Sequence, residues 1–218
     1  MTGSTLPSTQ QLTLLTTAPV QPTPAGAFRA VASAEPDPLA RMLLATMTDP
    51  VSPMLNEGNL LGWTGLSDVQ EAMHLLLAAQ EDALIEAVTE QAMLPNTSLE
   101  DLMPPLLEGL SQEGKALVAD PDGLPMWTAG FDADSAARVA AMSADLASLR
   151  ERHVDTIEAV LGDAASAWAL VDGVGASRMG SWPLHIGGTR FELVTQGLPR
   201  MHHSSFTYLV WLLVHRYG

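Results

Sequence analysis

Cysteine is absent from this 218-residue sequence, and basic residues are few. Without thiols the chain can form no disulfide framework, no thiolate zinc site, no iron–sulfur cluster and no cysteine nucleophile. Ten Lys and Arg against 25 Asp and Glu give a formal charge of −15. A negative charge of this size repels the phosphate backbone of nucleic acids and the anionic face of membranes. We therefore expect no nucleic-acid partner.

Long hydrophobic runs are also absent. The C-terminal stretch FTYLVWLLV covers only nine residues, whereas a membrane-spanning helix needs about 20. The first 20 residues contain no basic region and no apolar core of signal-peptide length. Because 47% of the residues are nevertheless hydrophobic, the chain has enough apolar surface for a globular core. We expect a cytoplasmic protein without a membrane span.

Composition and periodicity divide the chain into three parts. Residues 1–37 are rich in Thr, Ser, Pro and Ala, and such a segment buries too little apolar surface to order itself, so we predict a disordered tail. Residues 38–95 contain apolar positions at helical spacing over 38–48 and about 68–93, on either side of a glycine-containing loop. This spacing predicts a helical extension. Residues 96–218 form the third part.

In the third part the hydrophobic period alternates between that of helices and that of strands. A helix begins at Ser98 and is interrupted by Pro104 and Pro105, and a hairpin is centred on an Asp-Gly turn. The remaining predicted elements are a long helix from Asp132 or Asp134 to Leu161 and strands over 182–188, 189–195 and 205–216. Residues 164–181 fit a strand, a helix or a loop. The pattern predicts an α+β fold, with a five-stranded antiparallel sheet covered by helices.

Three groups of residues are candidates for chemical sites. Gly173, Gly175 and Gly180 could bind a nucleotide, His185, His202 and His203 could bind a metal, and Ser181 could act as a nucleophile. The glycine spacing differs from nucleotide-binding fingerprints. Adjacent histidines on an extended chain point in opposite directions, so the sequence leaves their convergence open. The serine lacks the GxSxG setting of an activated nucleophile. We therefore expect no catalytic residue, no metal, no cofactor and no enzymatic activity.

One order of motifs stands out over 99–149. It consists of Leu99, Leu102, Leu106 and Leu107 in the first helix, Ala116 to Val118 in a strand, Asp122, Gly123, Leu124 and Pro125 in a turn, and the alanine-rich helix that follows. With these residues the segment 98–218 resembles the Roadblock/LC7 domain, most closely over 99–149. The resemblance implies a profilin-like fold and a non-catalytic module that dimerises by pairing helices and sheet edges. It also implies regulation or scaffolding of a small Ras-like GTPase.

Two surfaces are predicted to bind a second copy or a partner. The first is a helix face with Arg138, Met142, Asp145 and Leu149, and the second is an edge strand with Trp182, Leu184 and Ile186. A last strand that is apolar on both faces and a helix with surplus apolar surface favour a homodimer. The alternative is an acidic, secretion-type chaperone that holds an effector segment by strand addition.

Overall fold

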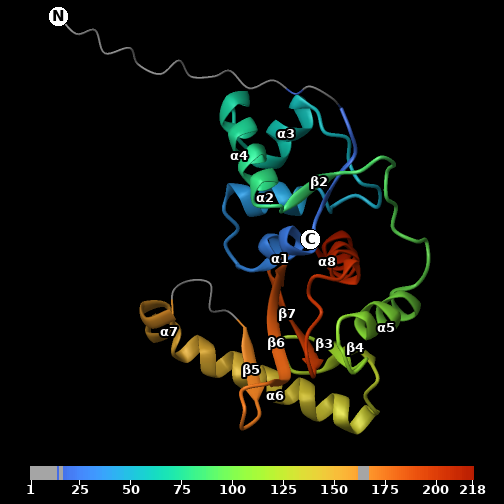
Figure 1. Ribbon diagram of the computed structural model, residues 1–218, viewed down its shortest axis with the longest axis vertical. Helices are drawn as coiled ribbons and strands as arrows, with labels where there is room; N and C mark the ends of the chain where they lie inside the picture. The colour runs from blue at the N-terminus through green and yellow to red at the C-terminus, as the bar shows by residue number, and fades with distance from the viewer. Residues whose placement is uncertain (1–13, 15–16, 162–166) are drawn as a thin grey trace, which may run out of the picture.

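A five-stranded antiparallel sheet forms the centre of the C-terminal half in this computed structural model, which describes residues 14, 17–161 and 167–218 (Figure 1). The strand order is β4-β3-β7-β6-β5. The strands are β3 (Ala116–Ala119), β4 (Pro125–Ala129), β5 (Trp168–Val171), β6 (Ser177–Ile186) and β7 (Thr189–Gln196). The predicted combination of several helices with a five-stranded antiparallel sheet is confirmed.

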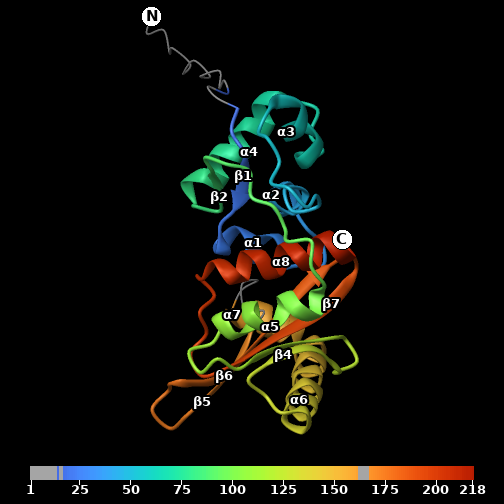
Figure 2. The same cartoon turned by 90° about the vertical axis from the view of Figure 1, so that its right-hand side faces the viewer.

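Helices cover both faces of this sheet (Figures 1 and 2). On one face lies α6 (Ala133–Arg152), and α7 (Val154–Leu161) follows it after a break at His153. The other face is covered by α5 (Leu99–Gly109) and α8 (Ser204–Tyr217). Strand β3 shows the division, because Leu117 packs toward α6 whereas Val118 belongs to the core on the α8 side. Alternating side chains thus join two layers of helix to one sheet.

The N-terminal half packs on α8, and its helix α1 also contacts β6 of the sheet (Figure 2). Its elements are β1 (Val20–Pro22), α1 (Pro24–Val31), α2 (Pro38–Ala45), α3 (Glu57–Thr64), α4 (Val69–Glu81) and β2 (Ile85–Ala87). Strands β1 and β2 form an antiparallel pair, and α1 contacts both α2 and α8. One cluster of buried residues extends from this half into the sheet domain. The division at residues 95 and 96 stays a prediction.

Residues 20–31 form a strand and a helix where we expected a disordered tail through residue 37. Thr23 caps α1, because its Oγ1 accepts a hydrogen bond from the Gly26 N–H at 3.1 Å, and Ala27 and Val31 are buried. The segment is ordered by its contact with α8, which composition alone does not reveal. Residues 1–13, 15 and 16 of the predicted tail lie outside the described residues.

Two further predictions in the N-terminal half were wrong. The helix expected over about 68–93 ends at Glu81, and Ala83 adopts a positive φ of 53° that turns the chain into β2. The glycine-containing loop is largely helix α3, because Asn56 caps it and Gly65 ends it in the left-handed conformation. The burial of Leu60 and Thr64 offsets the low helix propensity of the exposed Gly58 and Gly62 in α3.

The apolar run over 205–216, predicted as a strand, is helix α8. A continuous apolar run is compatible with a strand that is buried on both faces and with a helix that is buried on all sides. The spacing of apolar residues along the sequence does not distinguish the two. Every side chain from Leu209 to Val214 is buried. The fifth strand is instead β5, which lies in the segment left open by the sequence. The long helix predicted to Leu161 is divided into α6 and α7.

Truncation of a side chain in α8 should destabilise the whole chain. Leu209 is fully buried between the sheet and the N-terminal helices, so Leu209→Ala should lower the free energy of unfolding by about 2–5 kcal/mol. Urea denaturation followed by circular dichroism measures the change. The exposed His202→Ala, just before the helix, is the control, and a loss below about 1 kcal/mol for Leu209→Ala would contradict the central position of α8.

Candidate protein-interaction site

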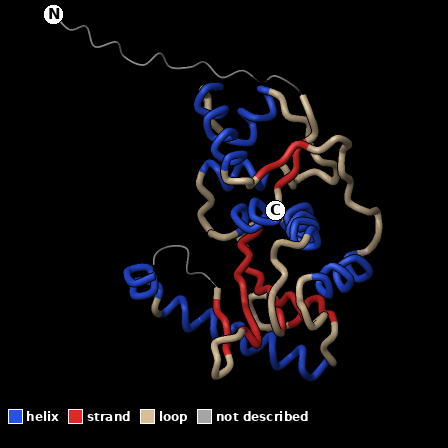
Figure 3. The backbone as a smooth tube through the Cα atoms, viewed as in Figure 1, coloured by secondary structure: helices blue, strands red, loops and turns tan. Residues whose placement is uncertain are grey.

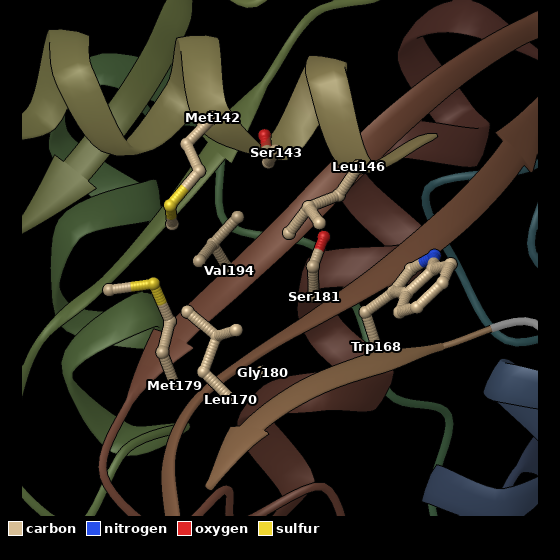
Figure 4. A pocket seen from close by; sticks show the side chains of 9 residues that line it. All are labelled: Met142, Ser143, Leu146, Trp168, Leu170, Met179, Gly180, Ser181 and Val194. Atoms are coloured by element: carbon tan, nitrogen blue, oxygen red, sulfur yellow. The ribbon is translucent and has the colours of Figure 1, made fainter. Parts of the chain in front are cut away.

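An apolar cleft opens between α6 and strands β5, β6 and β7 (Figure 4). It is narrow, with a cavity volume of only about 10 Å³, and is lined by Met142, Ser143, Leu146, Trp168, Leu170, Met179, Gly180, Ser181 and Val194. Sites for small molecules have volumes of roughly 300–1,000 Å³. The cleft is therefore too small to enclose a cofactor, and what it presents is a narrow apolar surface.

Small residues on α6 create the cleft. Ala136, Ala140, Ser143 and Ala147 are the buried residues of this helix, and such short side chains allow it to approach the sheet closely. Met142 lies on the flank and points from α6 into the cleft, as does Leu146, while side chains of the strands point back toward them (Figure 4). The Asp132 carboxylate accepts the Ser135 N–H at 2.9 Å and so defines where α6 begins.

Strand β5 gives the cleft an open edge. It pairs with β6 on one side, and no strand among residues 17–161 and 167–218 pairs with its other side. Leu170 and Val171 of this strand are exposed, and Val174 in the following turn is 91% exposed. Of the ten exposed large apolar side chains found in the described residues, five lie between Val160 and Val174. An apolar edge strand of this kind is a template for pairing with another chain.

A polar network lies next to the cleft, beneath the C-terminal end of α6. Glu192 of β7 is only 3% exposed, and the Ser181 hydroxyl donates to its Oε2 at 2.8 Å. The Nε of Arg190 lies 3.2 Å from the Glu192 Oε1, and the same guanidinium forms an ion pair with Glu151 of α6. The network therefore links β6, β7 and α6. Glu192 is buried because it lies on the sheet face that α6 covers.

Burial changes the protonation of two groups here. It raises the pKa of Glu192 above its usual 4.5, although the Ser181 hydrogen bond and the Arg190 charge oppose this shift. Burial also lowers the pKa of His185, and the charges of Arg190 and Arg150 lower it further. Both shifts favour the neutral form of the group.

The three histidines that the sequence left open do not meet at one site. His185 lies on β6, whereas the His203 ring caps α8, with its Nδ1 3.2 Å from the Ser205 nitrogen. No group of three or more His, Cys, Asp or Glu is placed to hold a metal ion in the part of the chain that the structure describes. In that same part, no helix has both the length and the apolar character needed to cross a bilayer.

The structure brings one of the four predicted α6 residues to the cleft. Met142 lines it, whereas Arg138 and Asp145 are exposed on the helix and Leu149 is partly buried. Arg138 forms an exposed ion pair with Asp134 one turn earlier, at 2.9 Å. A pair of this kind contributes little to stability. These residues remain a candidate surface that continues from the cleft along α6.

The predicted edge-strand residues need a correction. Leu184 is 0% and Ile186 2% exposed, and both belong to the core beneath α8, so their side chains cannot contact a partner. Trp182 is partly buried on the same face, and a Cβ at Gly180 would lie only 2.1 Å from its ring. The open edge is β5, whose signal in the sequence was the apolar run of Trp168 to Val171.

Comparisons with known proteins leave the family open. No protein-family model matches this sequence, and no curated protein matches it. Among solved structures, the Roadblock/LC7 domain from Streptomyces avermitilis is similar with a TM-score of 0.34 and 18% identity. The match covers 55% of this chain and 93% of that one. A likeness at this level assigns no function to the chain.

Replacing Glu192 should change how stability depends on pH. An acid whose pKa is raised by folding holds its proton more tightly in the native state, so its contribution to stability falls as pH rises from about 4.5 through the raised value. Glu192→Gln does not lose stability in this way, because an amide side chain does not ionise as the pH rises. The free energy of unfolding of Glu192→Gln minus that of the unmodified chain should therefore increase across this window and then level off.

Urea denaturation at a series of pH values measures that difference. Glu90→Gln, at an exposed position, is the control for the loss of one carboxylate. A difference that stays constant with pH for Glu192→Gln, or the same slope for both variants, would contradict the role of burial.

Proposed function

We propose that this chain is a non-catalytic regulatory or scaffolding module that forms a homodimer through α6 and β5 and binds a protein partner. The observation that carries this proposal is the apolar cleft beside an unpaired strand edge. Exposed apolar side chains that continue from the cleft along β5 support it, because such patches on soluble proteins mark interaction surfaces.

A second copy of the chain is a suitable occupant of this surface. In a twofold dimer the same patch is used on both subunits, and the edges of two antiparallel β5 strands can pair with each other. The sheets would then join across the interface, with Leu170 and Met142 near the twofold axis. The Trp168 indole N–H is buried without an acceptor among the described residues, and a polar group of the second copy could accept its hydrogen bond.

The partner class rests on the sequence resemblance. Residues 98–218 resemble the Roadblock/LC7 domain, and this resemblance implies a small Ras-like GTPase. Affinity capture from the native host, identification by mass spectrometry and titration of the purified GTPase in its GDP and GTP forms would test it. Saturable binding that differs between the two nucleotide states supports the proposal. The absence of a GTPase among the captured proteins counts against it.

Strand addition by an effector segment is the second candidate, because the free edge of β5 accommodates an extended peptide as readily as a second copy. The two candidates predict different stoichiometry. An effector segment would occupy the edge and dissociate the homodimer, whereas a GTPase regulator would keep two copies in the complex. The mass of the purified complex by light scattering separates them.

Substitution on β5 should dissociate the homodimer. We expect the unmodified chain to have twice its 23.1 kDa mass at micromolar concentration, and Leu170→Asp to raise the dimer dissociation constant at least tenfold, because it places an unpaired charge in an apolar interface. Light scattering over a concentration series measures both. Leu124→Asp, at an exposed apolar position just before β4 at the opposite sheet edge, is the control.

Two results would contradict the proposed dimer through β5. One is a monomeric mass for the unmodified chain at micromolar concentration. The other is equal dissociation by Leu170→Asp and Leu124→Asp, which would mean that the interface does not lie at β5.

A further inference from the structure

Helices α3 and α4 form a helix-turn-helix at the end of the molecule remote from α6 (Figures 1 and 3). The turn covers residues 65–68, and it begins with Gly65 in the left-handed conformation at a φ of 67°. The Asp68 side chain then caps α4 by accepting the Gln70 N–H at 2.7 Å. In DNA-binding proteins that contain this motif, the second helix enters the major groove. Neither the cleft nor the sheet edge uses this helix.

The outer side of α4 is both apolar and acidic. Its inner side is formed by Ala72, Met73, Leu76 and Ala79, which are buried. Leu77 is 40% exposed, and Glu71 and Glu81 are exposed on the same helix. These two carboxylates are ten residues apart, which corresponds to about 15 Å along a helix axis. Along the helix axis the exposed leucine thus lies between two negative charges, and around the axis it is about 40° from Glu81 and about 120° from Glu71.

The charge of this half of the chain excludes the usual ligand of a helix-turn-helix. Twelve Asp and Glu residues and no Lys or Arg lie between Met42 and Gly114. DNA-reading helices use Lys and Arg to contact phosphate groups, and α4 offers none. In the part of the chain that the structure describes, the ion pairs do not involve α4 or β2. The negative charge on α4 is therefore not neutralised within the fold.

We propose that α4 is a docking surface for a basic amphipathic helix of a partner protein. An apolar side chain of the partner would pack against Leu77, and two Lys or Arg residues about ten positions apart would face Glu71 and Glu81. The charge complementarity selects a basic partner, and the exposed leucine selects an amphipathic one. The docking surface is independent of the dimer through β5, so it stands if that dimer fails.

A synthetic peptide and the full-length chain test this surface. The probe is a 15-residue helix-forming peptide with lysines at positions 3 and 13 and leucines on the face between them, and a scrambled peptide of the same composition is its control. Titration followed by backbone amide chemical shifts should show saturable binding, with the largest shifts on α4. The double variant Glu71→Gln with Glu81→Gln should weaken binding about three- to tenfold, as the loss of two exposed ion pairs predicts. Leu77→Ser should weaken it as well.

The matched control is Glu100→Gln with Glu108→Gln, which removes the same charge from exposed positions on α5 and should leave the affinity within twofold. Light scattering reports the oligomeric state of every variant, so a loss of docking is distinguished from a loss of the dimer. Three outcomes overturn the proposal: equal weakening by both double variants, equal binding of the scrambled peptide, or shifts scattered over the whole surface. Binding of a 20-base-pair DNA duplex that depends on Glu71 and Glu81 would also overturn it.

Discussion

The burial of α8 on all sides is the interaction on which the rest of the structure depends. The sheet packs on one side of this helix and α1 on another. Phe206 is fully buried and lies 6.2 Å from the ring of Phe28 on α1. The Trp211 indole donates to the Asp49 carbonyl at 2.7 Å, which ties the loop after α2 to the same helix. One apolar helix thus joins the first and last parts of the chain in a single core.

The burial of α8 makes the two faces of the sheet differ in how completely they are covered. On the sheet face under α5 and α8, side chains such as Leu184 and Leu193 are buried in the core. These buried side chains are therefore not exposed for a partner to contact. The opposite face of the sheet is covered by α6 alone. The small side chains of α6 leave a cleft along its flank, and β5 ends the sheet there with an unpaired edge. The position of the proposed interaction surface follows from incomplete coverage of the sheet face under α6.

The acid excess has different meanings in different parts of the chain. Most carboxylates lie on solvent-facing sides of helices, where they favour solubility and exclude nucleic acids. Glu192 is an exception, since it is buried and links Ser181 to Arg190. On α4 the carboxylates flank an exposed leucine on a helix that faces outward. Only the fold distinguishes these three settings, because the residue type is the same in each.

The sequence by itself determined the elements whose signals are local. The Ser98 cap, the helix start at Asp132 or Asp134, the Asp-Gly hairpin turn and the hydrophobic period over 189–195 are decided by neighbouring residues, and they predicted α5, the start of α6, β3, β4 and β7. Only the tertiary structure decided that 205–216 is a helix, that residues 20–31 are ordered and that β5 is the open edge. The physical reason is that each of these depends on what packs against the segment, and an apolar run carries no record of its neighbours.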